Sequence, residues 1–146
     1  MAIALPSGVA SAKTKPNKGT CTTITGNATT ITQTGCTDLP DTGGSGVSTT
    51  THESISGSTV TGADSVVWHT GLTSTETFTG TLKSGKADKC HPSAGQTNLY
   101  EVKQKGLVTG GTATHLVGSK TKSIVCVFTV SSGIAVKNFP GKPISF

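Results

Sequence analysis

The sequence predicts an all-β protein: an antiparallel sandwich or flattened barrel of about eight to ten short strands, held by two disulfides. Threonine, serine and glycine make up 63 of the 146 residues, and the β-branched side chain of threonine favours extended backbone. Apolar residues alternate with polar ones in short segments that glycine-rich turns separate, which is the periodicity of strands. No window of the chain has the apolar spacing of a helix.

The first half of the chain is expected to form a hairpin and four further strands. The hairpin joins residues 20–25 to 28–34 through Gly26-Asn27, a dipeptide typical of two-residue turns. A loop rich in proline, aspartate and glycine follows over 38–46. Further strands are expected at 47–56, 58–62, 65–70 and 75–82. Segment 65–70 (SVVWHT) is the best candidate for a core strand, with Ala63-Asp64 as its boundary.

Within 75–82, Phe78 and Leu82 fall on the same face of the expected strand, because side chains of alternate residues point the same way. The second half of the chain repeats the alternating pattern after a lysine-containing loop over 83–95. Gly106 is a place for a bulge or bend, and 123–130 (SIVCVFTV) is apolar enough for the centre of a sheet. Strands are expected at 98–108, 123–130, 134–136 and 144–146, and 112–117 is expected to begin the return from the first of them.

Four cysteines indicate two disulfides: Cys21, Cys36, Cys90 and Cys126. Their even number, without a Cys-x-x-Cys motif, is typical of a small protein from an oxidising compartment. Sequential pairing, first with second and third with fourth, closes the shortest loops, and each bridge would stabilise by roughly 3–4 kcal/mol in the chain-entropy model. A two-residue turn at Gly26-Asn27 would place Cys21 opposite Thr32, so the pairing needs either a bend at Gly35 or a longer turn.

The first residues favour export. Residues 1–12 end in Ala10-Ser11-Ala12, the form of a signal-peptidase site, although a basic start and a long apolar segment are missing. We therefore expect a residual signal-peptide segment over 1–12, a flexible tail over 13–19 and a single all-β domain over 20–146. The expected location is extracellular, in solution or at the cell envelope. No apolar stretch is long enough for a membrane span.

The charge pattern limits the partners. The net charge of +5 comes from 12 basic residues, all of them lysine. Because arginine makes the bidentate contacts that nucleic-acid readers depend on, its absence argues against a nucleic-acid partner. The dispersed lysines favour a solvated basic surface, with attraction to an acidic envelope polymer, or contact with another protein, as the alternative.

No motif predicts catalysis, a metal site or a cofactor. Leu39-Pro40-Asp41-Thr42-Gly43 matches the LPxTG form that sortases cleave, but no apolar segment and basic tail follow it, so a loop is expected. The four histidines lack a metal-ligand spacing, and no activated-nucleophile motif is present. A glycosidase needs paired carboxyls in a cleft with sugar-stacking aromatics, and the chain has one Trp and one Tyr. We expect a protein that is not an enzyme.

Five residues are candidates for ligand binding. Trp68 or Tyr100 would provide a stacking platform in a carbohydrate-binding module, and Asn98, Gln96 or Asp64 would provide hydrogen bonds. Burial in the core is the stronger expectation for Trp68, because a small domain with few aromatics must bury the largest one.

An ordered set of short motifs resembles a group of small secreted actinobacterial proteins of unknown function. The set runs from Cys21-x14-Cys36 through Val66-Val67-Trp68 and Cys90-His91-Pro92 to Val125-Cys126-Val127 and a final Pro-Gly-x-Pro-Ile-x-Phe, and it covers 20–146. The resemblance implies an exported, disulfide-bonded β-protein and implies no catalytic residues. The expected function is therefore a structural or interaction domain, secreted or associated with the cell envelope. A carbohydrate-binding module is the alternative, followed by a hydrolase.

Overall fold

The fold is a single sheet of antiparallel strands in a computed structural model that describes residues 18–84 and 90–146. Within these ranges the strands are β1 (Thr20–Gly26), β2 (Thr30–Thr37), β3 (Ser45–Ser56), β4 (Thr59–Trp68), β5 (Thr73–Lys83), β6 (Thr97–Gly110), β7 (Lys120–Val130), β8 (Gly133–Asn138) and β9 (Ile144–Ser145), with a 3-10 turn η2 (Thr114–Leu116).

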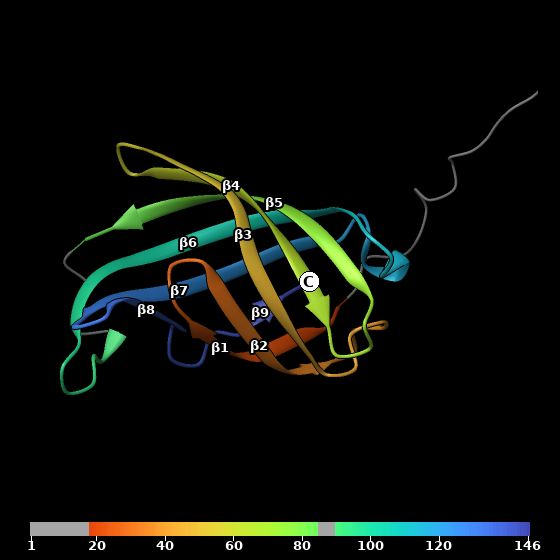
Figure 1. Cartoon of the computed structure of the whole chain (residues 1–146), viewed down its shortest axis with the longest axis horizontal. Helices are drawn as coiled ribbons and strands as arrows, with labels where there is room; N and C mark the ends of the chain where they lie inside the picture. The colour runs from red at the N-terminus through yellow and green to blue at the C-terminus, as the bar shows by residue number, and fades with distance from the viewer. Residues whose placement is uncertain (1–17, 85–89) are drawn as a thin grey trace, which may run out of the picture.

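The sheet closes on itself as an eight-stranded barrel. Each strand from β1 to β8 pairs with the next one along the chain, and β8 pairs back onto β1 (Figure 1). The ninth strand, β9, is an addition that pairs with β1 and β7. The all-β prediction is therefore confirmed, and of the two predicted architectures the barrel is the one found.

The first hairpin has a longer turn than the two-residue turn predicted at Gly26-Asn27. Gly26 lies opposite Ile31, and the side-chain oxygen of Asn27 accepts hydrogen bonds from the backbone N–H groups of Thr29 and Thr30, both at 2.9 Å. Asparagine side chains stabilise turns in this way. The register that results places Cys21 directly opposite Cys36, so the prediction of a two-residue turn was wrong and its alternative, a longer turn, is correct.

Two further predicted boundaries were wrong. Strand β4 continues through Ala63-Asp64, where a break was expected, because the Asp64 side chain finds a hydrogen-bond donor inside the barrel. Segment 112–117 was predicted to begin a strand, but it forms η2 instead. The turn buries Leu116 completely, and the backbone N–H of Ala113 donates to the carbonyl of Thr73 at 2.8 Å.

Both disulfides have the sequential pairing. Cys21–Cys36 joins β1 to β2, and Cys90–Cys126 ties the segment before β6 to β7. Bridges of this kind persist in oxidising compartments. The predicted signal-peptide segment over 1–12, most of the tail over 13–19, and positions 85–89 of the lysine-containing loop lie outside the described residues.

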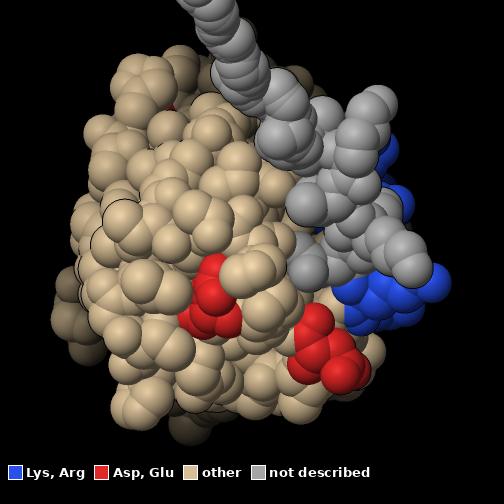
Figure 2. All heavy atoms as spheres, turned by 90° about the vertical axis from the view of Figure 1, so that its right-hand side faces the viewer, with Lys and Arg blue, Asp and Glu red and all other residues tan. Residues whose placement is uncertain are grey.

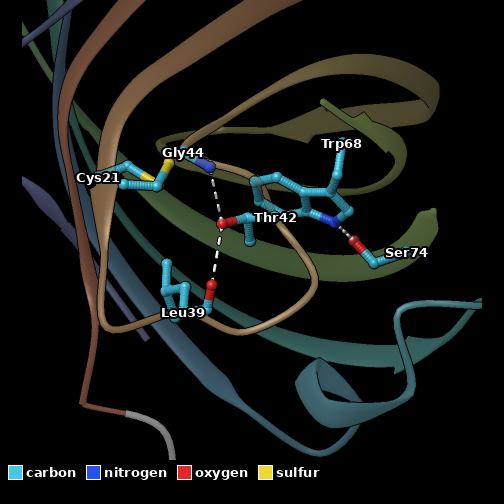
Figure 3. Close-up of a disulfide and its surroundings, with 7 residues drawn as sticks. Cys21, Leu39, Thr42, Gly44, Trp68 and Ser74 are labelled. Carbon is cyan, nitrogen blue, oxygen red and sulfur yellow. Dashed lines mark hydrogen bonds between the residues drawn. A yellow bond between two sulfur atoms is a disulfide. The ribbon is translucent and has the colours of Figure 1, made fainter. Parts of the chain in front are cut away.

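One end of the barrel is filled by a core around Trp68. The indole is 2% exposed, its N–H donates to the Ser74 hydroxyl at 3.0 Å, and Phe146 packs against it edge-on with ring centroids 6.2 Å apart. Figure 3 shows Trp68 and Ser74 near the Cys21–Cys36 bridge and the Thr42 turn. Gly46 makes room for the indole, since a Cβ there would lie 2.5 Å from its six-membered ring. Burial of Trp68 agrees with the stronger of its two expectations.

The outside of this end carries few charges. Figure 2 looks onto the end of the barrel that bears η2, and the described surface there is mostly uncharged, with acidic side chains in two places and lysines along one side. Among the described residues there is no helix of the length and hydropathy that crossing a membrane requires.

We call the end of the barrel that Trp68 fills the closed end. The free energy of unfolding is expected to depend on this residue. Trp68→Ala should lower the free energy of unfolding by about 3–5 kcal/mol, because it empties a packed site. Trp68→Phe should cost less, since it keeps an aromatic ring and loses the bond to Ser74. Urea unfolding followed by circular dichroism measures both. Val67→Ala, at the exposed neighbouring position, is the control and should cost under about 0.5 kcal/mol. Equal losses at positions 67 and 68 would contradict this assignment.

Candidate functional site: a cavity inside the barrel

The interior of the barrel contains a cavity of about 330 Å³. Side chains alternate between the two faces of a strand, so every second residue of each strand points inward. The described lining is mostly apolar. Each of the eight barrel strands contributes at least one aliphatic side chain to it. Near the middles of β3 and β5, polar and acidic residues take inward positions.

The cavity has an apolar mouth and a polar floor. Around the mouth lie Ile55, Leu82 and Tyr100, from the end of β3, the end of β5 and the start of β6. Ile55 is 57% exposed, so the cavity reaches the protein surface here. Deeper, towards the Trp68 core, a belt of polar side chains crosses β2, β3, β4, β5 and β7. We call it the polar belt: Gln33, Ser48, Asp64, Glu76 and Thr121.

Asp64 and Glu76 are the two acids of the polar belt. They are register partners on the adjacent strands β4 and β5, and side chains of such a pair lie within about 5 Å of each other at Cβ. The Ser48 hydroxyl donates to Asp64 Oδ2 at 2.8 Å. The Thr121 hydroxyl, which β7 brings across β6, donates to Glu76 Oε1.

Gly106 on β6 creates the space in which Glu76 and Thr121 meet. It lies between β5 and β7, opposite Phe78 on one side and Thr121 on the other. A Cβ at this position would overlap both the Glu76 carboxyl and the Thr121 hydroxyl. The glycine that the sequence marked as a bend is therefore required for close approach of two other side chains.

Burial changes the acidity of both carboxyls. Desolvation, and then repulsion from Asp64, raise the pKa of Glu76 from 4.5 to about 7, with the Thr121 hydrogen bond acting in the opposite direction. Desolvation also raises the pKa of Asp64, against the hydrogen bond from Ser48. Near neutral pH, Glu76 can therefore donate or accept a proton inside the cavity.

Two buried oxygen atoms in the polar belt have no hydrogen-bond partner among the described residues: Gln33 Oε1 and Asp64 Oδ1. Gln33 is only 6% exposed. A buried acceptor without a partner costs about 1–3 kcal/mol, and such groups are rare in folded proteins. Both atoms belong to residues that line the cavity, where a bound molecule would be able to donate to them.

The structure separates the predicted ligand-binding residues, and it places Asp64 in the polar belt. Trp68 lies in the closed core and is not available as a stacking platform. Tyr100 is half-buried and lines the mouth of the cavity. Asn98 is on β6, but its side chain lies outside the described part of the structure.

Of the polar belt, Asp64 was predicted as a hydrogen-bond partner for a ligand, whereas Glu76 and Gln33 were missed, although strand parity indicates all three. Glu76 is two residues before Phe78 and six before Leu82, so it shares their inward face. Asp64 likewise shares a face with Val66 and Trp68. Gln33 shares a face of β2 with Ile31. The sequence indicates such a residue when a polar side chain falls on the same face of a strand as the apolar ones.

The remaining chemical candidates lie away from the cavity. The Nδ1 of His115 is 3.0 Å from the Asp41 carboxylate, at the closed end. In the LPDTG segment, Thr42 is 1% exposed and its hydroxyl donates to the carbonyl of Leu39 at 3.0 Å, so the segment is a packed loop. Within the described ranges, no three His, Cys, Asp or Glu side chains gather as metal ligands would.

A second hollow of about 580 Å³ lies on the outer face of β5, β6 and β7. We call it the lysine groove, after four of its described lining residues: Lys103, Lys105, Lys122 and Lys142. Lys105 and Lys122 are register partners across β6 and β7. No acidic residue is among the described residues of its lining, so the groove concentrates positive charge.

No protein-family model matches this chain, and neither does any curated protein or solved structure.

The stability of the fold is expected to fall as pH rises. Glu76 has a pKa of about 7 in the folded protein against 4.5 ordinarily, so the folded state holds the proton more tightly. The free energy of unfolding should fall between about pH 4.5 and 7, by about 3 kcal/mol from this group. The raised pKa of Asp64 acts in the same direction. Urea unfolding between pH 4 and pH 8 measures the change.

Glu76→Gln should remove most of this dependence and stabilise the protein at pH 8. Its matched control is Glu101→Gln on β6, a residue that lies opposite Lys83 and is not part of the cavity lining. Identical pH profiles for the wild type and Glu76→Gln would contradict the assignment.

Proposed function

We propose that this protein is an exported binding protein that encloses a small amphipathic molecule inside its barrel. The observation that carries the proposal is the cavity, which combines an apolar mouth with a belt containing two unpartnered buried acceptors. Pockets for small molecules commonly have this composition, an apolar lining with a few convergent polar groups. An eight-stranded barrel is wide enough to hold one small ligand.

The way the interior is built supports a ligand. Glycine occupies the inward position 106, and serine, threonine and glutamine occupy others where a packed barrel would have large aliphatic side chains. The volume left is about 330 Å³, at the lower end of the range for ligand pockets. An apolar body would lie against Ile55, Phe78 and Leu82, and a polar end would reach the belt.

The proposed location follows from the cysteines. Two disulfides in a domain of this size favour an oxidising compartment, and Ala10-Ser11-Ala12 has the form of a signal-peptidase site. The secreted actinobacterial proteins that the chain resembles would share this location.

Carbohydrate binding is a second candidate, favoured by Tyr100 at the mouth and by the acceptors of the polar belt. Sugar hydroxyls would donate to Gln33 and Asp64. The apolar majority of the lining favours a more hydrophobic ligand, so we rank this candidate second. We propose binding and not catalysis for both.

The cavity is expected to take up N-phenyl-1-naphthylamine, an uncharged apolar fluorophore. Its emission should rise and shift to the blue on binding, with a dissociation constant in the micromolar range, and fluorescence titration measures it. Val136→Phe narrows the cavity from β8 and should weaken binding at least tenfold.

Val67→Phe makes the same change at an exposed position of β4 and should leave binding of the fluorophore unaltered. Circular dichroism of both variants checks that they fold. No emission change with the wild-type protein, or equal binding by both variants, would contradict enclosure. Displacement of the fluorophore by mono- or disaccharides at millimolar concentration would instead favour the carbohydrate candidate.

We further propose that the lysine groove attaches the protein to an acidic polymer of the cell envelope. Convergent lysines attract polyanions in a salt-dependent way. Lys105→Gln with Lys122→Gln should lower the sodium chloride concentration that elutes the protein from a dextran sulfate column. The control, Lys18→Gln with Lys83→Gln, removes the same charge outside the groove and should shift elution less. Equal shifts would assign the attraction to net charge alone.

A further inference from the structure

The barrel separates its charges between inside and outside. Three of the seven acidic residues line the cavity: Glu53, Asp64 and Glu76. None of the described lining residues is a lysine or a histidine, although the chain has 12 lysines and a net charge of +5. On β6 and β7, the lysines of the groove (Lys103, Lys105 and Lys122) occupy the opposite, outward face of the sheet. The cavity of a basic protein is therefore acidic.

The polar belt offers acceptors and few donors. Each of its two carboxyls receives one hydroxyl donor from the protein, Asp64 from Ser48 and Glu76 from Thr121. Asp64 Oδ1 and Gln33 Oε1 remain without a donor. A molecule that completes this belt must supply several N–H or O–H groups at one end, close to two carboxyls on adjacent strands.

We propose that the molecule enclosed in the barrel is a small primary amine with an apolar body, its ammonium group held between Asp64 and Glu76 with the Gln33 carbonyl as a further acceptor. This inference rests on the proposed enclosure of a ligand and specifies its chemical class. An ammonium group has three donors and no acceptor, which matches the excess of acceptors in the belt. Hydrogen bonds between charged groups are also stronger than neutral ones.

The same geometry discriminates against other head groups. A carboxylate or phosphate would face Asp64 and Glu76 with like charge, and the described lining has no cation to offset it. An alcohol would supply a single donor and leave at least one acceptor unpartnered. An amine is therefore favoured over an alcohol of equal length, and an acid is the least favoured.

Amine binding should release a proton near neutral pH. The groups facing the Glu76 carboxyl are Asp64 from β4 and the uncharged Thr121 from β7, and Glu53 and Tyr100 line the same cavity. An ammonium ion beside Glu76 favours its charged form, so the pKa of Glu76 falls below about 7 on binding. Affinity for an amine should therefore rise between pH 6 and pH 8.

The test compares n-octylamine, n-octanol and octanoate by isothermal titration calorimetry at pH 7.5. The amine should bind at least tenfold more tightly than the alcohol, and the acid more weakly still. Titrations in two buffers of different ionisation enthalpy should show proton release with the amine and none with the alcohol.

Three variants locate the preference. Asp64→Asn and Glu76→Gln keep the oxygens that Ser48 and Thr121 donate to, and each should reduce the advantage of the amine over the alcohol about tenfold. Glu101→Gln removes the same charge outside the cavity and should leave the advantage intact. Fluorophore binding should be unchanged in Glu101→Gln, and circular dichroism of all three variants checks that they fold.

The outcomes separate the two proposals. If the fluorophore binds but octanol or octanoate equals octylamine, enclosure stands and the amine assignment falls. If Glu101→Gln reduces the preference for the amine as much as Glu76→Gln does, the preference comes from the net charge of the protein. The assignment of the ammonium group to Asp64 and Glu76 then also falls. If neither the fluorophore nor any octyl compound binds, enclosure itself is wrong.

Discussion

The seam between β1 and β8 is the contact on which the rest of the molecule depends, because it turns a sheet into a barrel. It is short: Thr25 pairs with Lys137 and Gly26 with Val136. The side chain of Asn138 lengthens it, accepting from the backbone N–H of Ile24 at 3.2 Å and donating to the carbonyl of Thr22 at 3.1 Å. Strand β9 continues the pairing beyond it along β1. Closure removes the open edges of a sheet and gives every strand an inside face.

That inside face is only partly filled, and the two ends of the barrel differ as a result. At one end Trp68, Phe146 and Leu116 pack near the first disulfide. In the middle, the inward positions carry carboxyl, amide and hydroxyl groups, which cost free energy when buried. The packed end and the disulfides supply stability that offsets this cost, and the polar belt retains its buried carboxyls and unpartnered oxygens. A barrel with this interior has a lower free energy of unfolding than one with an all-apolar interior. In return, its cavity is more selective for a ligand.

Much of the fold follows from local patterns, and the site follows from them only in part. Threonine-rich alternation predicted most strands, and the cysteine order predicted both bridges. Parity alone would have placed Glu76 inside, in phase with Phe78. Asp64 was taken for a boundary because aspartate is uncommon in strands, and only the contact with Ser48 explains its place. The meeting of Glu76 with Thr121, over Gly106, depends on a neighbour 45 residues away, which no local pattern contains.

The seam also determines when this chain is able to fold. Its two sides lie at opposite ends of the domain, so hairpins can form early while the barrel remains open until residue 138 is available. Contacts between distant parts of a chain are formed slowly. We therefore expect the desolvation of Asp64 and Glu76 to come late in assembly, because the interior that buries them exists only when the barrel has closed.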